Sequence, residues 1–570
     1  MCNLQVSTRQ NLPVCLTKED EFPPLTNTEN RIRRVKCDEQ KPACYKCVST
    51  GRTCSGYVDP GEHTTQAAVD AQNRFRIVQY MPEISQPTRM WQVPQSTGLL
   101  LESEYRSLEF FQINTTLCFG SGIGTFLLQA VHHEQILKSI AIALGSLHRS
   151  FTHKQSLTSD NREETRFTLL HYNKAIRDLV AINPKASYRG NDTFLIACIL
   201  FYCFDCLQGN FKSAFQHAIS GLKIIKHEQL IANVSGVGTY MPVEKITLLF
   251  SILENQVLEI ENEGILTSEL RPTASSFLHP AKSPSTSNDI ETLFISFQFL
   301  YNRFTRFLAI CDSLGESLGE KSPEFLESIQ SITAEYAQVR TNIETWIFTF
   351  ENWLEQPSSR RNDSDSVQIL KVWRLIIGIF LQLPLPPSEL DWDHFTDDFS
   401  AVNRLVANFL DAPSKSTLSR HSSPNTPTPT TPQVGSIPRV ASLPTLLPKP
   451  SKSETCMFSL SLGVVTPLYL CATRCRESSV RHHSIGLMSY CQRREGLWDS
   501  DLAARIAKRI VTIEEEAAQI LPGSDYTPAN IGPSCRVVSL SPAFEHSGQV
   551  KIRYNREGHL PVMTEEIFTW

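Results

Sequence analysis

The sequence contains no apolar run long enough to cross a bilayer and no secretory leader. A membrane-spanning helix needs about 20 apolar residues, whereas the stretch TFLIACILFYCF (193–204) is shorter and residues 457–473 are interrupted by serine, threonine, glycine and proline. The start, MCNLQVSTRQ, has no charged region followed by an apolar one. We therefore expect an intracellular protein without a membrane partner, in which both apolar stretches are buried helices.

A catalytic constellation is also missing. No G-x-S-x-G elbow is present, the turn GSGIGT (120–125) has no phosphate-loop lysine, and His132–His133–Glu134 lacks the second histidine of a zinc-protease helix. A charged and aromatic cluster, Arg493, Arg494, Glu495, Trp498 and Asp499, is interpreted as a helix start with packing salt bridges. The sequence therefore favours a protein that is not an enzyme.

The 16 cysteines, in a chain without a leader, are expected to be reduced thiols or metal ligands rather than disulfides. Cys203 and Cys206 lie in an apolar segment without basic neighbours or a partner pair, and Cys471 and Cys475 lie one helical turn apart. We expect these four cysteines to be core residues.

Length and charge indicate a small basic head on an acidic body. The 570 residues suffice for two to four domains at about 100–200 residues each. The net charge is −5, but residues 31–57 contain seven Lys or Arg against two acidic residues, so the remainder carries −10. Such an imbalance is typical of a polyanion-binding module attached to something else.

From about Leu99 the apolar residues recur at helical spacing. Residues 193–204 are apolar all round, which predicts a helix in the middle of a bundle. Phe294, Phe297, Tyr301, Phe304 and Leu308 share one helical stripe. Alternating strand patterns are few. Of residues 413–453, 24 are Pro, Ser or Thr and none is acidic, so we expect a disordered segment.

Four cysteines, Cys37, Cys44, Cys47 and Cys54, have the spacing C-x6-C-x2-C-x6-C. Two thiolates two residues apart can bind one Zn²⁺, and the flanking cysteines can complete a tetrahedron. The basic residues Arg31, Arg33, Arg34 and Lys36 precede the first cysteine. Such a density of cations suits phosphate binding, and guanidinium groups suit guanine edges in the major groove.

This segment, RIRRVKCDEQKPACYKCVSTGRTCSGY, resembles the second and larger part of the fungal Zn2Cys6 binuclear zinc-cluster DNA-binding domain. The resemblance implies two zinc ions held by six cysteines and a basic helix that reads a CGG-type triplet. Arg34 is the expected base contact, with Arg31, Arg33 and Lys36 on phosphates. Residues 194–225, 462–475 and 489–500 resemble the all-helical regulatory region attached to many such regulators.

The sequence departs from the family pattern at its first two cysteines, because positions 27 and 30 are Asn27 and Asn30. One explanation is a degenerate domain with at best a single Zn²⁺ on the four remaining cysteines. The other is that residues 1–30 are not the natural upstream sequence, as a misjudged exon boundary before Arg31 would produce. We favour the second explanation.

The expected fold is mainly α, with a partial zinc-cluster head, a large all-helical regulatory domain and disordered linkers. The predicted division is a disordered or non-native tail (1–30), a partial Zn2Cys6 DNA-binding domain (31–57), a linker (58–98), a helical regulatory domain (99–412), a disordered Pro/Ser/Thr-rich segment (413–455), a helical continuation (456–525) and an irregular C-terminal tail (526–570).

The function implied by the resemblance is that of a nuclear, zinc-dependent transcription regulator. Its partners would be double-stranded DNA and the transcription machinery or co-regulators. A homodimer stays open because no heptad follows Tyr57. The alternative is a non-DNA-binding interaction protein or co-regulator, derived from this family by loss of half the zinc cluster.

Overall fold

The structure is a computed structural model, and it describes Ser49 and residues 100–120, 122–153, 162–181, 190–231, 240–260, 289–315, 323–356, 364–385, 387–411, 456–544, 548–556 and 564–569. The chain forms two units, Met1–Ser96 and Thr97–Trp570. Apart from Ser49, every described residue belongs to the second unit, which we call the body. The predicted tail (1–30), linker (58–98) and Pro/Ser/Thr-rich segment (413–455) lie outside the described residues.

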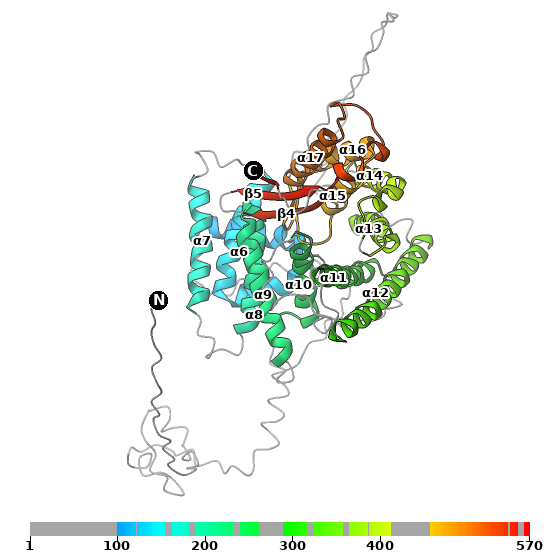
Figure 1. Cartoon of the computed structure of the whole chain (residues 1–570). Coiled ribbons are helices and arrows are strands. Elements are labelled where there is room, and N and C mark those ends of the chain that lie inside the picture. The colour runs from blue at the N-terminus through cyan, green and yellow to red at the C-terminus, as the bar shows by residue number, and fades with distance from the viewer. Residues whose placement is uncertain are drawn as a thin grey trace, which may run out of the picture. The chain divides into compact units, whose positions relative to one another are not determined.

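Helices dominate the described part of the body, which confirms the mainly α prediction (Figure 1). The first group comprises α4 (Glu102–Ile113), the 3-10 turn η1 (Thr115–Phe119), α5 (Gly124–His133), α6 (Gln135–Thr152), α7 (Arg162–Val180), α8 (Gly190–Gln208), α9 (Phe211–Ile231) and α10 (Val243–Ile260). The second comprises α11 (Ile290–Gly315), α12 (Pro323–Glu355), α13 (Asp365–Gln382), the 3-10 turn η4 (Asp391–Phe395), α14 (Thr396–Asp411), α15 (Val465–Arg474), α16 (Ser478–Cys491) and α17 (Ser500–Ala517).

Helix α8 forms the centre of the first hydrophobic core. Every residue from 195 to 207 is buried, as the all-round apolar sequence predicts. Helices α6 and α9 pack against it, and α9 in turn packs against α10. Gly221 permits the approach of α9 to α10, because a Cβ atom there would lie 2.1 Å from the ring of Phe250.

Aromatic side chains of α11, α12 and α13 build the second core. Phe297, Tyr301 and Phe304 are buried on one face of α11, which confirms the predicted stripe. The ring of Phe297 lies 4.6 Å from that of Trp346 on α12, and the ring of Tyr301 lies 4.6 Å from that of Trp373 on α13. Helix α10 lies between the two groups of helices and contacts both α9 and α11 (Figure 1).

Two small sheets complete the described part of the body. In the first, β1 (Met457–Ser459) runs parallel to β2 (Arg493–Glu495), which pairs with the antiparallel β3 (Trp498–Asp499). The second is an antiparallel sheet of β4 (Val537–Phe544), β5 (Gln549–Arg556) and β6 (Thr564–Thr569), in that order.

The second sheet corrects the expectation that residues 526–570 form an irregular tail. Strand β5 (QVKIRYNR) alternates, and its Val550, Ile552 and Tyr554 are buried in the first core. Strand β4 (VVSLSPAF) carries serines and a proline that obscure its apolar positions. It forms a strand because it pairs with β5, although its own residues show no strand pattern.

Candidate zinc and DNA site, and the charged centre of the body

All eight residues predicted to bind zinc or DNA lie outside the described residues. They are Cys37, Cys44, Cys47 and Cys54 for zinc, and Arg31, Arg33, Arg34 and Lys36 for DNA. Within the described ranges, no group of three or more His, Cys, Asp or Glu could hold a metal ion. None of the helices described there is both long and apolar enough to span a membrane.

The cysteines of the body have packing roles. Cys203, Cys206 and Cys471 are 0% exposed and Cys475 is 1% exposed, so the prediction of core cysteines is confirmed. Burial raises the pKa of all four thiols, because a thiolate is disfavoured away from water. They are therefore protonated, weakly reactive residues.

The charged and aromatic cluster at 493–499 forms strands β2 and β3, and the predicted helix start is confirmed for Asp499, which directly precedes α17. The side chain of Asp499 caps α17 by accepting a hydrogen bond of 2.9 Å from the amide of Leu502. Arg494 pairs with Asp499, its Nε lying 2.8 Å from Oδ2. The same guanidinium donates to the carbonyl of Leu207 at 2.9 Å, at the end of α8, and thereby joins α17 to the first core.

Glu495 caps the N-terminus of a second helix, α15, which lies far from Glu495 in the sequence. Its carboxylate accepts the amides of Val464 at 3.1 Å and Val465 at 2.9 Å, at the start of α15, and forms an ion pair of 2.9 Å with Arg493. This contact requires Gly463, since a Cβ atom there would lie 1.9 Å from the carboxyl carbon of Glu495. The two stretches 462–475 and 489–500 are thus one structural unit.

Helix α10 holds this unit through Gln256. The side-chain oxygen of Gln256 accepts the amide of Leu497 at 3.0 Å and the hydroxyl of Tyr202 on α8. The loop residue Gly496 has φ +61°, and a Cβ atom there would lie 1.9 Å from that same oxygen. A residue without a side chain is therefore needed at the point of contact.

One turn further along α10, Glu259 is a half-buried residue whose carboxylate is shared by three segments. It accepts the hydroxyl of Tyr301 at 2.7 Å, the indole N–H of Trp498 at 2.6 Å and the hydroxyl of Thr466 at 3.5 Å. Burial raises the pKa of Glu259 to about 7. The three hydrogen bonds favour the ionised form and lower this pKa, but the effect of burial is larger. Glu259 therefore links the first core to α11, β3 and α15.

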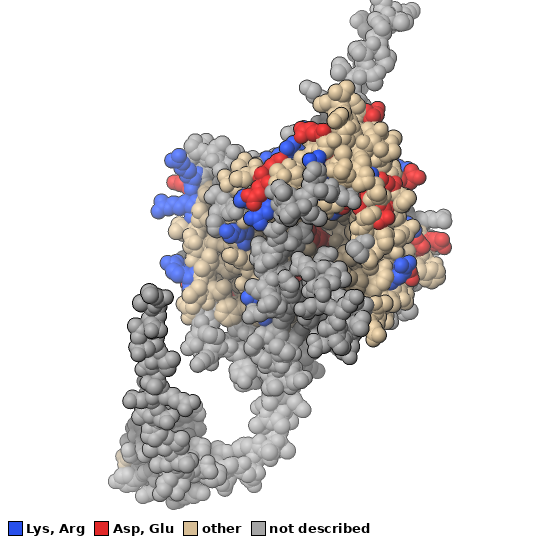
Figure 2. All heavy atoms as spheres, in the orientation of Figure 1, with Lys and Arg blue, Asp and Glu red and all other residues tan. Residues whose placement is uncertain are grey.

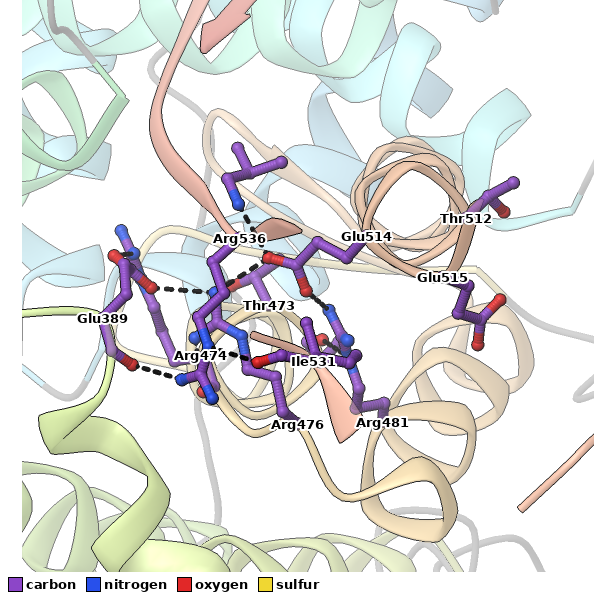
Figure 3. A network of polar contacts seen from close by, with 12 residues as sticks. Glu389, Thr473, Arg474, Arg476, Arg481, Thr512, Glu514, Glu515, Ile531 and Arg536 are labelled. Atoms are coloured by element: carbon purple, nitrogen blue, oxygen red, sulfur yellow. Dashed lines mark hydrogen bonds and ion pairs between the residues drawn. The ribbon is translucent and has the colours of Figure 1, made fainter. Parts of the chain in front are cut away.

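A third polar centre, the Glu514 network, joins α15, α16 and α17 (Figure 3). The carboxylate of Glu514 accepts from Arg476 at 2.9 Å, from Arg481 at 2.7 Å and from the amide of Val537 at 2.9 Å. Glu514 and both guanidiniums are 0% exposed. Burial opposes ionisation of Glu514, but Arg481 and Arg476 outweigh it and lower the pKa of this carboxyl.

The network continues to the residues just before α14. Arg476 also pairs with Glu389 at 2.8 Å, and Arg474 pairs with the other oxygen of that carboxylate. Arg536 donates to both oxygens of Asp393, at 2.8 and 2.6 Å, and to the carbonyl of Glu389 at 2.7 Å. Four stretches of the chain, at 389–393, 474–481, 514 and 536–537, are thereby fixed to one another.

Sequence reasoning missed the Glu514 network. The one available signal was a carboxylate among apolar residues of an amphipathic helix, since Glu514 follows Ile510, Val511 and Ile513 in α17. That signal indicates a buried charge that needs a partner, but it does not identify the partner.

A cysteine-rich basic segment ahead of a large helical body, with its charges and thiols in packing roles, is the organisation of a zinc-cluster transcription regulator. Residues 31–62 match the model of the fungal Zn(2)-Cys(6) binuclear cluster domain, a zinc-binding and DNA-binding domain. This match includes the four cysteines and four basic residues predicted above, and begins after Asn27 and Asn30.

Relatives extend the similarity over nearly the whole chain. The aspercryptin biosynthesis cluster-specific transcription regulator of Emericella nidulans is 33% identical over 594 residues, covering 95% of this chain and 95% of the relative. A transcription regulator of Purpureocillium lilacinum is 25% identical over 206 residues, covering 35% of this chain and 48% of the relative. An uncharacterized transcriptional regulatory protein of Schizosaccharomyces pombe is 59% identical over 27 residues, covering 5% of each chain.

No solved structure matches the chain. The similarity to the Emericella regulator nevertheless shows the family: the chain belongs to the fungal Zn(2)-Cys(6) transcription regulators, whose cofactor is zinc.

Proposed function

We propose that the chain is a nuclear regulator that binds double-stranded DNA sequence-specifically through residues 31–57. The observation that carries this proposal is the spacing C-x6-C-x2-C-x6-C directly behind four basic residues. Thiolates at that spacing suit zinc. The cations in front of them suit the phosphate backbone.

The basic residues would divide their contacts between bases and phosphates. Arg34 is assigned to a CGG-type triplet, because a guanidinium can pair with the O6 and N7 atoms of guanine. Arg31, Arg33 and Lys36 are assigned to phosphates, which position the domain without reading sequence.

The metal would be held by Cys37, Cys44, Cys47 and Cys54. Four thiolates complete the tetrahedron of one Zn²⁺. Because Asn27 and Asn30 occupy the first two ligand positions of the family pattern, the donor set is two thiolates short of the family's two-ion cluster. When bound, the ion would fix the fold of the head rather than take part in a reaction.

Outside residues 31–57, we assign regulation to the helical body. Residues 1–30 form a disordered or non-native tail, 58–98 a linker and 413–455 a disordered segment, while 99–412 and 456–525 form the regulatory domain. Its partners would be the transcription machinery or co-regulators, and a homodimer is compatible with this assignment. We assign no catalysis to the chain.

A second candidate function is that of a co-regulator that no longer binds DNA. It is favoured by one observation, the replacement of two family cysteines by Asn27 and Asn30.

DNA binding by the full-length chain distinguishes the two. The unmodified chain and the Asn27→Cys/Asn30→Cys variant would be titrated with duplexes that contain or lack a CGG-type triplet, at several salt concentrations. In the Asn27→Cys/Asn30→Cys chain, which we call the restored chain, Arg34→Ala should reduce the preference for duplexes with a CGG-type triplet by about 1–3 kcal/mol. Arg31→Ala should weaken binding to all duplexes alike. It should also lower the slope of log K against log salt concentration by about one.

Absence of any triplet preference in the restored chain would overturn the DNA-binding proposal. If only the unmodified chain fails to bind, the co-regulator is the better account.

A further inference from the structure

Helix α7 lies at the edge of the body and has two very different faces. Its inner face is tied to neighbouring helices: the hydroxyls of Thr168 and Ser146 are 2.8 Å apart, and Glu164 pairs with Arg149 at 2.5 Å. Ala175 is 0% exposed on the same face. These contacts fix the rotation of α7 and therefore determine which residues face solvent.

The outer face carries three arginines and three exposed aliphatic residues, with the exposed Glu163 at its N-terminal margin. We call it the α7 stripe, and it consists of Arg162, Arg166, Leu169, Leu170, Arg177 and Val180. These positions follow steps of three, four and eight residues and share one side of the helix over about 27 Å. Figure 2 shows Lys and Arg side chains gathered along the left edge of the molecule, over α7.

The arginines of the stripe differ from three other arginines of the body. Arg106, Arg340 and Arg505 each pair with an acidic residue four positions away on the same helix. In the stripe, the position four residues after Arg162 is another arginine, and that after Arg166 is a leucine. Within the described residues, none of the three stripe arginines has an ion-pair partner.

Local helix energetics neither strongly favour nor strongly oppose this arrangement. Like charges four residues apart, as at Arg162 and Arg166, weaken a helix slightly. In the first turn, Glu163 and Glu164 offset the unfavourable interaction of Arg162 with the helix dipole.

The aliphatic members of the stripe indicate the kind of partner. Leu170 and Val180 are 59% and 80% exposed, and Leu169 is 36% exposed. A nucleic acid backbone would satisfy the guanidiniums but leave the leucines in the middle of the stripe without apolar contact. A helix with leucines on one face and carboxylates at its margins complements both features.

We propose that the α7 stripe docks an acidic amphipathic helix of a partner protein. The partner's leucines would cover Leu169 and Leu170 while its carboxylates pair with Arg166 and Arg177. One helix face buries less area than a stable interface needs, so the contact would be weak and transient. This proposal uses no residue of the zinc-cluster segment and does not depend on the function of that segment.

The test uses the full-length chain and two probes. The first is a fluorescein-labelled 18-residue peptide with leucines at positions i, i+3, i+4 and i+7 and glutamates elsewhere, with a scrambled peptide of the same composition as its control. The second is a DNA duplex. Expected results are salt-dependent binding of the amphipathic peptide in the micromolar range and weaker binding of the scrambled one.

Three variants locate the site. Arg166→Glu/Arg177→Glu should weaken peptide binding about tenfold or more, because attraction becomes repulsion at two positions. Leu170→Asp should weaken it comparably through lost apolar contact and added repulsion. Lys508→Glu, an exposed charge reversal on α17, is the matched control and should leave peptide binding unchanged.

Several results would overturn the proposal. One is that all variants bind the amphipathic peptide equally well, and another is that the scrambled peptide binds as tightly as the amphipathic one. A third is that Arg166→Glu/Arg177→Glu weakens binding of the DNA duplex but not of the peptide. Arg34→Ala should affect the duplex and spare the peptide, so failure of DNA binding is distinguishable from failure of the α7 stripe.

Discussion

Replacing Glu514 by glutamine tests whether the Glu514 network holds the second half of the body together. Glutamine keeps the volume of glutamate, so no cavity forms. It removes the negative charge that two fully buried guanidiniums share, at 2.9 Å from Arg476 and 2.7 Å from Arg481. It also places an amide N–H₂ among donors, including the amide of Val537.

The free energy of unfolding is expected to fall by about 3–5 kcal/mol, the usual cost of removing one partner of a buried ion pair. Arg476 keeps Glu389 as a partner, but Glu514 supplies the carboxylate paired with Arg481 in the described part of the chain. Urea unfolding followed by tryptophan fluorescence measures the loss as a lowered midpoint at unchanged m value.

The neighbouring residue provides the matched control. Glu515 lies on the same helix but points away from the arginines (Figure 3), and its carboxylate accepts the hydroxyl of Tyr526 at 2.8 Å. Glu515→Gln should cost no more than about 1 kcal/mol, as for a single hydrogen bond near the surface. Equal midpoints for Glu514→Gln and Glu515→Gln would refute the stabilising role of the network.

Three further predictions concern Glu259, Gly463 and zinc. The pKa of Glu259 is raised by burial from 4.5 to about 7, so wild-type stability should fall by up to about 3 kcal/mol as pH rises through this window. Glu259→Gln should abolish that fall, measured as the difference between two pH series of unfolding midpoints. Gly463→Ala should cost about 3 kcal/mol in unfolding experiments, because its Cβ would displace the carboxylate of Glu495. Metal analysis of the full-length chain should find at most one Zn²⁺, and two after Asn27→Cys/Asn30→Cys.

Each of these has a result that contradicts it. Parallel pH series for wild type and Glu259→Gln would show that this carboxyl does not titrate in the window. Gly378→Ala is the control for Gly463, because a Cβ atom there meets nothing within 4 Å. It should stabilise α13 by up to about 1 kcal/mol. Two zinc ions in the unmodified chain would disprove the role assigned to the missing cysteines.

The features predicted correctly from the sequence are those encoded locally. The burial of α8 on all sides follows from an apolar run within one helix, and the buried stripe of Phe297, Tyr301 and Phe304 follows from their spacing. The start of α17 next to the cluster 493–499 is likewise local, because Asp499 acts on the amide three residues later. The cysteine spacing that marks the zinc-cluster family lies within 18 residues.

In the C-terminal sheet, the alternation of β5 was a signal that the sequence analysis overlooked, whereas β4 was beyond such reasoning. Strand β4 shows no clean alternation, and what makes it a strand is its pairing with β5, from Val537 with Arg556 to Phe544 with Val550, with a register shift between Val537 and Ser539. Pairing energy comes from cross-strand neighbours, which a single segment does not contain.

The polar centres of the body depend still more on tertiary structure. Arg536 and Asp393 are 143 residues apart in the sequence, and Trp498 and Glu259 are 239 apart. Local sequence determined that Glu514 and Glu259 lie on helices and that α17 has an apolar face. Only the packing of those helices decided which cation or donor would meet each buried carboxylate, because a buried charge is stabilised by whatever group the fold brings within about 3 Å of it.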